Sequence, residues 1–170
     1  AAVVAESGIR DAATVRRLGA HADAFLVGSQ LTSQPDVDRA CRELVYGPNK
    51  VCGLRSASAA QAAKAAGAVY GGLIFEDASP RNVSRETAVE IIAAEPGLDY
   101  VAVSRRTSGY GDLAQPGITA VQVHAPYQGS LDAERELIER VRRAFADQPM
   151  QLPDGTALDV TCTIGAIALP

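Results

Sequence analysis

The protein has 170 residues, of which 47% are hydrophobic, and its formal net charge at pH 7 is −4. A chain of this length and composition can bury the core of one ordinary domain. Because both signs of charge are scattered and no basic run occurs, the composition predicts no nucleic-acid partner and no anionic membrane partner. No apolar stretch approaches the roughly 18 residues of a membrane helix, and the start of the sequence lacks the pattern of a signal peptide.

Three cysteines are present, Cys41, Cys52 and Cys162, and no CxxC pair occurs. An odd number at wide spacings predicts neither a disulfide framework nor a structural zinc site, and it favours a reduced, cytoplasmic protein. The two histidines, His21 and His124, are more than 100 positions apart and form no local metal-binding pair. We therefore expect no metal.

Two strand–helix units are predicted before residue 48. Their elements are, in chain order, a strand over residues 2–5, a helix over 11–18, a strand over 24–27 and a helix from about 35 to 46. Asp11 is expected to cap the first helix and Gly19 to end it. The last helix carries apolar residues at i, i+3 and i+4 spacing. Gly47-Pro48 then breaks the pattern, so we expect a domain boundary that separates residues 1–47 from 48–170.

The second part of the chain continues the alternation of strands and helices. Strands are predicted over residues 50–52, 69–75, 100–103, 119–123 and 158–164, and helices over 57–66, 84–94 and 131–145. Ser56, Ser84 and Ser130 are suitable N-caps for these helices. The strand over 69–75 is a continuous apolar run, which is typical of a parallel strand covered on both faces. Residues 104–117 show no convincing helical pattern.

This alternation predicts an α/β fold. Most predicted strands begin 20 to 30 residues after the previous one, with one helix between them. Repeated βα units give a parallel sheet with right-handed crossovers. Cys52 stands where the strand over 50–52 ends, before Gly53, and in βα-barrels that edge carries the chemistry.

Several motifs resemble two known enzyme families. KVCGL, AGAVYGGLIF and SPRNV resemble the start of phosphoribosylanthranilate isomerase, and VVAESGI and HADAFLVGSQL resemble the last two strands of indole-3-glycerol-phosphate synthase. They run together through RELVYGPNKVCGL, as in the bifunctional synthase–isomerases of bacterial tryptophan biosynthesis. The resemblance extends to about Val123. It implies parts of two (β/α)₈ TIM barrels: residues 1–47 as the last two βα units of the synthase barrel, and 48–170 as about the first five strands of the isomerase barrel.

Neither implied barrel is complete, since one barrel typically needs about 250 residues. We therefore expect the chain to be a fragment of a longer natural polypeptide that supplies the missing barrel segments. The resemblance implies phosphosugar–anthranilate molecules as substrates and no cofactor. It places the synthase's catalytic lysines before Ala1. The isomerase's acid, an aspartate on a later strand, and its phosphate-binding loops would lie beyond Pro170.

The implied isomerase reaction is an Amadori rearrangement of N-(5-phosphoribosyl)anthranilate to an aminoketose. It needs an acid to open the sugar ring and a base to remove the C2 proton. By residue type alone Cys52 fits an inert core thiol. The resemblance implies that Cys52 is the base, which a thiol becomes when its pKa falls toward the working pH.

Arg81 and His124 are candidate substrate-binding residues. Arg81 fits a surface arginine beside a helix start, whereas the resemblance implies a partner for the anthranilate carboxylate, which a planar bidentate donor suits. His124 follows a strand and fits a structural histidine equally well. The resemblance places it near the substrate, although the family usually has glycine where Ala125 stands.

In the synthase part, the candidates again follow strands. Gly28-Ser29 fits an ordinary tight turn. The resemblance implies instead that backbone N–H groups of Gly8, Gly28 and Ser29 bind the substrate phosphate. Glu6 and Ser7 resemble the family's substrate-contacting pair, and an acidic residue at the end of a buried strand favours this role. The implied synthase activity is a ring closure with decarboxylation.

Two features depart from the isomerase pattern, and two alternatives stay open. Residues 104–117 lack the helix normally found after the third strand, and the tail over 151–170 lacks the usual fifth-strand sequence. One alternative is a histidine-pathway phosphosugar isomerase, which would carry an aspartate where Cys52 stands. The other is an inactive barrel fragment that only binds, or that associates with a complementary piece.

Overall fold

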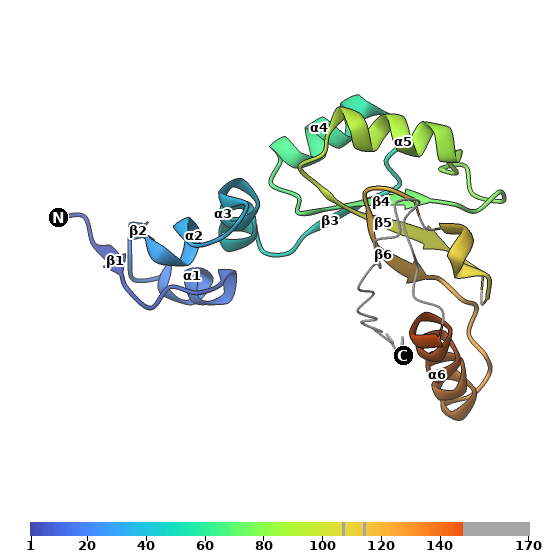
Figure 1. Cartoon of the computed structure of the whole chain (residues 1–170). Helices are drawn as coiled ribbons and strands as arrows, with labels where there is room; N and C mark the ends of the chain where they lie inside the picture. The colour runs from blue at the N-terminus through green and yellow to red at the C-terminus, as the bar shows by residue number, and fades with distance from the viewer. Residues whose placement is uncertain (107, 114, 148–170) are drawn as a thin grey trace.

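The computed structural model describes residues 1–106, 108–113 and 115–147. Helices and strands alternate along most of this range (Figure 1). In chain order the elements are β1 (Val4–Glu6), α1 (Ala12–Leu18), β2 (Ala24–Leu26), α2 (Ser29–Thr32), α3 (Val37–Tyr46), β3 (Lys50–Cys52), α4 (Ala57–Ala65), β4 (Tyr70–Ile74), α5 (Arg85–Ala94), β5 (Asp99–Ser104), the 3₁₀ helix η1 (Tyr110–Leu113), β6 (Ile118–Val123) and α6 (Leu131–Asp147).

The strands form two separate parallel sheets. β1 pairs with β2, and β3, β4, β5 and β6 form a second sheet in that order. Each strand of the second sheet pairs with the next strand in the sequence, and the order never reverses. This is the arrangement of a barrel wall, which is not closed by the residues described here. The predicted α/β fold with parallel sheets is confirmed.

The two faces of the four-stranded sheet differ in what covers them. Helices α4 and α5 lie along one face (Figure 1), where the main core forms around the fully buried side chains of Leu73, Tyr100 and Ile118. The opposite face carries a smaller cluster of Ile74, Val101 and Val103, against which Cys52 packs. This alternation follows from the two-residue period of side chains along a strand. Cys52 therefore lies on the face away from the two helices.

Polar caps fix the helix starts as predicted. The side chains of Asp11, Ser56 and Ser84 each accept a hydrogen bond from a backbone N–H in the first turn of α1, α4 and α5. Ser130 accepts one from Ala133 N at 3.2 Å. Such caps satisfy N–H groups that have no partner inside the helix.

The structure departs from the predicted elements at two places. The first strand spans Val4–Glu6 rather than residues 2–5, and the four-residue helix α2 was not predicted. A single turn of helix is too short to show an apolar period, which explains the omission. Within the described part of 104–117, only the 3₁₀ helix Tyr110–Leu113 forms. The strand predicted over 158–164 lies outside the described residues.

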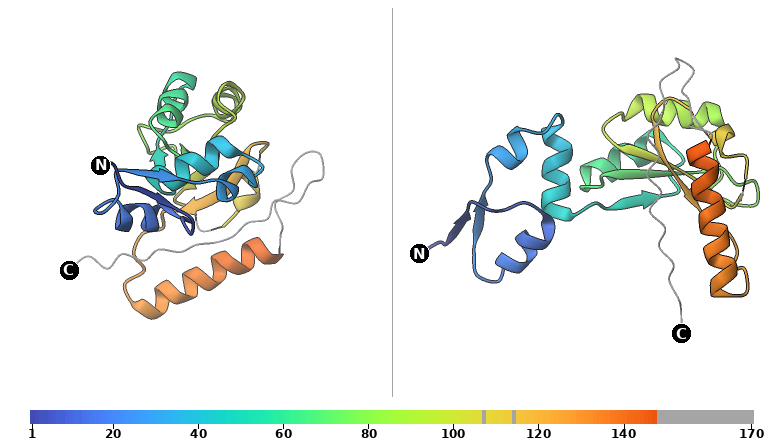
Figure 2. Two further views of the ribbon diagram at one scale, coloured as in Figure 1. Left: turned by 90° about the vertical axis from the view of Figure 1, so that its left-hand side faces the viewer. Right: turned by 60° about the horizontal axis from the view of Figure 1, so that its bottom comes forward.

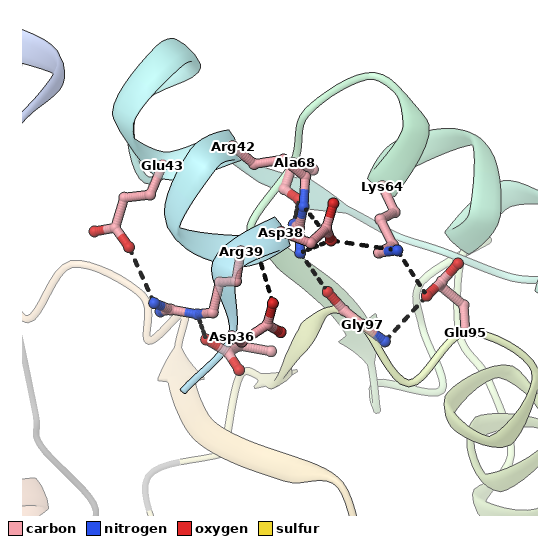
Figure 3. A network of polar contacts seen from close by, with 10 residues as sticks. Asp36, Asp38, Arg39, Arg42, Glu43, Lys64, Ala68, Glu95 and Gly97 are labelled. Carbon is pink, nitrogen blue, oxygen red and sulfur yellow. Dashed lines mark hydrogen bonds and ion pairs between the residues drawn. The ribbon is translucent and has the colours of Figure 1, made fainter. Parts of the chain in front are cut away.

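Helix α3 joins the first part of the chain to the second sheet through a polar network (Figure 3). The buried guanidinium of Arg42 donates to the backbone carbonyls of Ala68 and Gly97, which precede β4 and β5. Asp38 accepts from Arg42 and lies 3.3 Å from the Lys64 ammonium. Figure 2 shows the first part of the chain at one end of the four-stranded sheet. The helix before the predicted boundary thus contacts the amino ends of β4 and β5.

A second arginine of α3 extends this contact. Arg39 Nε donates to the Asp99 carboxylate at 2.8 Å and its Nη1 lies 3.0 Å from the Glu43 carboxylate. Its guanidinium also lies 5.9 Å from the ring centre of Tyr70.

The domain boundary at residues 47 and 48 stays a prediction. No helix among the described residues combines the length and apolar character needed to cross a membrane.

Candidate active site

A cavity of about 350 Å³ opens at the carboxyl ends of the strands of the second sheet. The residues that line it are Cys52, Ile74, Glu76, Ser79, Arg81, Val103, Ser104, Arg105, His124 and Ala125. They come from the ends of β3, β4 and β5 and from the segments after β4, β5 and β6. Parallel strands bring such segments to one edge of the sheet, where βα-barrels hold their active sites. The structure therefore brings together Cys52, Arg81 and His124, three predicted site residues that are far apart in the sequence.

Cys52 is the last residue of β3, and a glycine of β4 makes room for its thiol. Gly72 lies directly opposite Cys52 in the strand register. A Cβ atom at Gly72 would stand 3.0 Å from Cys52 Sγ, so a larger residue would displace the thiol. The backbone N–H groups of Gly53 and Leu54 both donate to the Gly72 carbonyl, at 2.9 and 3.0 Å. These bonds hold the end of β3 while Cys52 stays half-buried at the cavity.

Arg81 reaches the cavity from the loop over residues 76–83, which several internal hydrogen bonds stabilise. Asn82 accepts from Glu76 N at 2.8 Å, and its own N–H donates to the Ser79 carbonyl at 3.0 Å. Ser79 Oγ accepts from Arg81 N at 3.2 Å. The Arg81 side chain then lies across Gly53, where a Cβ atom would stand 2.8 Å from Arg81 Cδ. The loop thus places the guanidinium next to the residue that follows Cys52.

His124 is held from both its backbone and its ring. Its N–H donates to the Ser104 carbonyl at 2.8 Å, which ties the end of β6 to the end of β5. Its Nε2 atom forms a hydrogen bond with the side-chain amide of Gln122. Gln122 Oε1 in turn accepts from the ammonium of Lys50. These contacts fix the imidazole at the rim of the cavity, where it stays exposed to solvent.

The cavity holds charges of both signs. Among the described residues no ion pair forms with Arg81, a cavity-lining residue whose guanidinium carries five N–H donors. The Glu76 carboxylate accepts from Arg105 N at 3.2 Å. Glu76, Ser104 and Arg105 also line the cavity and were not predicted as site residues. Each lies at or just after the end of a predicted strand, and that position is the signal that would have found them.

The synthase-part candidates lie elsewhere, at the carboxyl edge of the two-stranded sheet (Figure 1). They are Glu6, Ser7, Gly8, Gly28 and Ser29, and all are exposed. Glu6 pairs with Leu26 in the parallel register, so the segments after both strands emerge on the same side. Ser7 and Gly8 have left-handed backbone, with φ of 65° and 69°.

One expectation about this sheet was wrong. The sequence predicted that Glu6 ends a buried strand, but Val4 is 56% exposed and Leu26 is 62% exposed. A sheet of only two strands cannot cover both of its own faces.

Family comparisons match the two parts of the chain separately. The family model of indole-3-glycerol phosphate synthase matches residues 1–44, and that of N-(5'phosphoribosyl)anthranilate (PRA) isomerase matches residues 49–149. The tryptophan biosynthesis protein TrpCF of Corynebacterium glutamicum is 71% identical over 148 residues, which cover 87% of this chain and 31% of that protein. TrpCF of Salmonella typhi is 43% identical over 143 residues, which cover 81% of this chain and 31% of that protein. The chain thus spans about a third of the length of these relatives.

Proposed function

Because this chain belongs to the family of bifunctional tryptophan-biosynthesis proteins that join indole-3-glycerol phosphate synthase to PRA isomerase, we propose that the polypeptide containing it catalyses both reactions. The isomerase part makes up more of this chain than the synthase part does. The observation that carries this proposal is the convergence of Cys52, Arg81 and His124 on one cavity. A base, a carboxylate anchor and a further polar contact are three of the parts that a rearrangement of N-(5-phosphoribosyl)anthranilate requires, beside the acid that opens the sugar ring.

Cys52 acts in this proposal as the base. An acid protonates the ring oxygen, the furanose C1–O bond breaks, and an iminium forms between C1 and the anthranilate nitrogen. The Cys52 thiolate then takes the proton from C2, and the C–H electron pair neutralises the iminium to give an enolamine that tautomerises to the aminoketose. Because Gly72 leaves the thiol uncovered at the cavity, the sulfur can approach a bound C2. The acid is assigned to the aspartate that the resemblance places on a later strand.

Arg81 serves as the anchor for the anthranilate carboxylate. A guanidinium without an ion-pair partner in the described part of the chain can present two parallel N–H donors to a planar carboxylate. Its position across Gly53 supports a binding mode in which the aromatic end of the substrate lies beside the segment that follows Cys52. This arrangement would direct the sugar carbon toward the thiol.

For the synthase reaction, we assign the substrate phosphate to the backbone N–H groups of Gly8, Gly28 and Ser29. The parallel pairing of β1 and β2, which brings these segments to one edge, supports this role. Left-handed backbone at a non-glycine residue costs roughly 1–3 kcal/mol and concentrates at functional sites. That conformation at Ser7 supports substrate contacts by Ser7 and its neighbour Glu6.

The test is substitution of Cys52 by alanine in the full-length polypeptide. We expect isomerase turnover to be lost while synthase turnover stays at the wild-type level, because the synthase candidates lie on another sheet. Cys41→Ser is the matched control, since Cys41 is also a free, partly buried thiol but lies on α3. Near-normal isomerase activity in Cys52→Ala would remove the assignment of the base.

For these 170 residues alone, a second proposal is association with the complementary barrel segments. Val4, Leu26 and Val51 are apolar strand residues that lie exposed, which supports further strands or helices packing there. Binding of the missing segments without turnover by the chain alone would support this reading. Isomerase turnover by the isolated chain would contradict it.

We also propose a cytoplasmic location, which the free thiols of Cys41 and Cys52 support.

A further inference from the structure

We propose that Lys50 and Gln122 are positioning residues that hold His124 as a neutral imidazole with its proton on Nδ1. The inference rests on the proposed function only in that it gives His124 a defined part in the isomerase cavity. Two contacts carry it: the Lys50 ammonium donates to Gln122 Oε1, and the Gln122 amide nitrogen meets His124 Nε2.

The direction of each hydrogen bond follows from the chemistry of the three groups. An ammonium has three donors and no acceptor, so Lys50 can contact only the carbonyl oxygen of the Gln122 amide. This fixes the amide orientation and leaves the NH₂ group facing His124. Since an NH₂ group only donates, His124 Nε2 must accept, and it carries no proton. A neutral ring with an unprotonated Nε2 carries its proton on Nδ1.

The strand geometry explains how residues so far apart in sequence meet. Lys50 lies two residues before Cys52 on β3, and Gln122 lies two residues before His124 on β6. The two-residue period of strands places each pair on one face. β3 and β6 are the two edge strands of the sheet, about 14 Å apart if it were flat, since neighbouring strands lie about 4.8 Å apart. The contact therefore requires the sheet to curl toward this face, as a barrel wall does.

The proton position decides what His124 can do for the substrate. Nε2 uses its lone pair on the Gln122 amide, and Nδ1 keeps a hydrogen, so the ring has no free basic nitrogen. His124 therefore cannot compete with Cys52 for the C2 proton. What it offers is one N–H donor at Nδ1, suited to an acceptor oxygen such as a sugar hydroxyl or a carboxylate.

The test is ¹⁵N NMR of the full-length polypeptide labelled at its histidine side chains, with His124→Gln used to identify the resonances of His124. We expect Nδ1 at the position of a protonated nitrogen and Nε2 at that of an unprotonated one, opposite to the tautomer that free histidine favours. Wild-type protein with a protonated Nε2 on His124 would overturn the inference.

Two substitutions test the roles of the positioning residues. Gln122→Glu presents only acceptor oxygens, so we expect the proton to appear on Nε2. Lys50→Met keeps a long side chain but removes the donor, so the amide can rotate and the preference for Nδ1–H should be lost. Lys50→Arg is the matched control that keeps a donor and should keep the wild-type pattern. An unchanged pattern in Lys50→Met would overturn the role of Lys50, even if Gln122→Glu fails to fold.

These measurements separate the inference from the proposed function. The NMR pattern needs no turnover, so it can fail while the isomerase assignment stands. Conversely, Cys52→Ala should keep the wild-type pattern of His124, whatever its activity. For Gln122→Glu we also expect isomerase kcat/KM to fall about tenfold, the effect of one hydrogen bond to substrate, with synthase kcat/KM unchanged.

Discussion

The side chain of Arg81 lies directly across the backbone of Gly53, the residue that follows Cys52. A Cβ atom at Gly53 would stand 2.8 Å from Arg81 Cδ, and the φ angle of Gly53 is +86°. The glycine is therefore required both for the turn after β3 and for the position of the guanidinium. The proposed carboxylate anchor and the proposed base therefore both depend on the same short segment of chain.

Gly53→Ala should therefore damage the isomerase site. We expect the added methyl group to displace Arg81 and to raise the isomerase KM, and the positive φ to cost about 1 kcal/mol or more of stability. Steady-state kinetics and urea unfolding of the full-length polypeptide measure the two effects. Gly129→Ala is the control, because Gly129 also has a positive φ, +92°, but no atom of the described residues lies within 4 Å of its missing Cβ. Equal KM changes in both variants would contradict the contact.

Arg81→Lys tests the planar geometry of the proposed anchor. The substitution keeps the positive charge but replaces two parallel N–H donors by a point charge. We expect the isomerase KM to rise about tenfold, the cost of one charge-assisted hydrogen bond, with a smaller change in kcat. Arg17→Lys, at an exposed position of α1, should leave both constants unchanged. An unaltered KM in Arg81→Lys would show that a simple positive charge suffices.

Arg42→Met should destabilise the protein more than any exposed arginine substitution. Arg42 is 7% exposed and satisfies the carbonyls of Ala68 and Gly97, which methionine cannot do. Leaving two such acceptors unpaired costs roughly 2–4 kcal/mol, measured as a shift of the urea midpoint. Arg135→Met, which removes only an exposed pair with Asp132, should cost less than about 1 kcal/mol. Similar losses in the two variants would contradict the role of the buried guanidinium.

Tyr100 should make stability fall at alkaline pH. Burial, and then the negative charge of Glu95, raise the pKa of Tyr100 to about 12, above the value of about 10 for an unfolded chain. The unfolded state thus loses the Tyr100 proton at a lower pH than the folded state. The contribution of this group to the free energy of unfolding is therefore complete below about pH 10 and is lost as the pH rises through about 12. Urea unfolding at pH 8 and pH 11 measures the change.

Tyr100→Phe is the variant that isolates this effect. It removes the hydroxyl that donates to the Glu95 carbonyl at 2.7 Å, at a cost of about 1 kcal/mol near neutral pH. The alkaline loss of stability should be smaller in this variant than in the wild type. Tyr127→Phe, at an exposed loop position, should keep the wild-type pH dependence. An identical alkaline loss in Tyr100→Phe would assign the effect to other groups.

Local chemistry made most elements predictable, whereas contacts between distant residues were not. Asp11 and Ser56 mark helix starts because a cap bonds to a backbone N–H only three residues away. Cys52 and His124 could be placed at one sheet edge because parallel strands impose it. The contact between Lys50 and Gln122 joins residues 72 positions apart, and no periodicity in the sequence encodes it. Its existence depends on the curl of the sheet, which only the folded chain displays.

The contact of Arg42 with the carbonyls of Ala68 and Gly97, which precede β4 and β5, bears on how such a fusion can be divided. If a gene were cut at the codons for Gly47 and Pro48, the upstream product would keep the guanidinium and the downstream product would keep the two acceptors. A stand-alone isomerase would need a replacement donor, from its own leading segment or from water, at the loops before β4 and β5. Splitting the gene would therefore leave these two carbonyls without their donor. Substitutions near the amino ends of β4 and β5 would have to replace it.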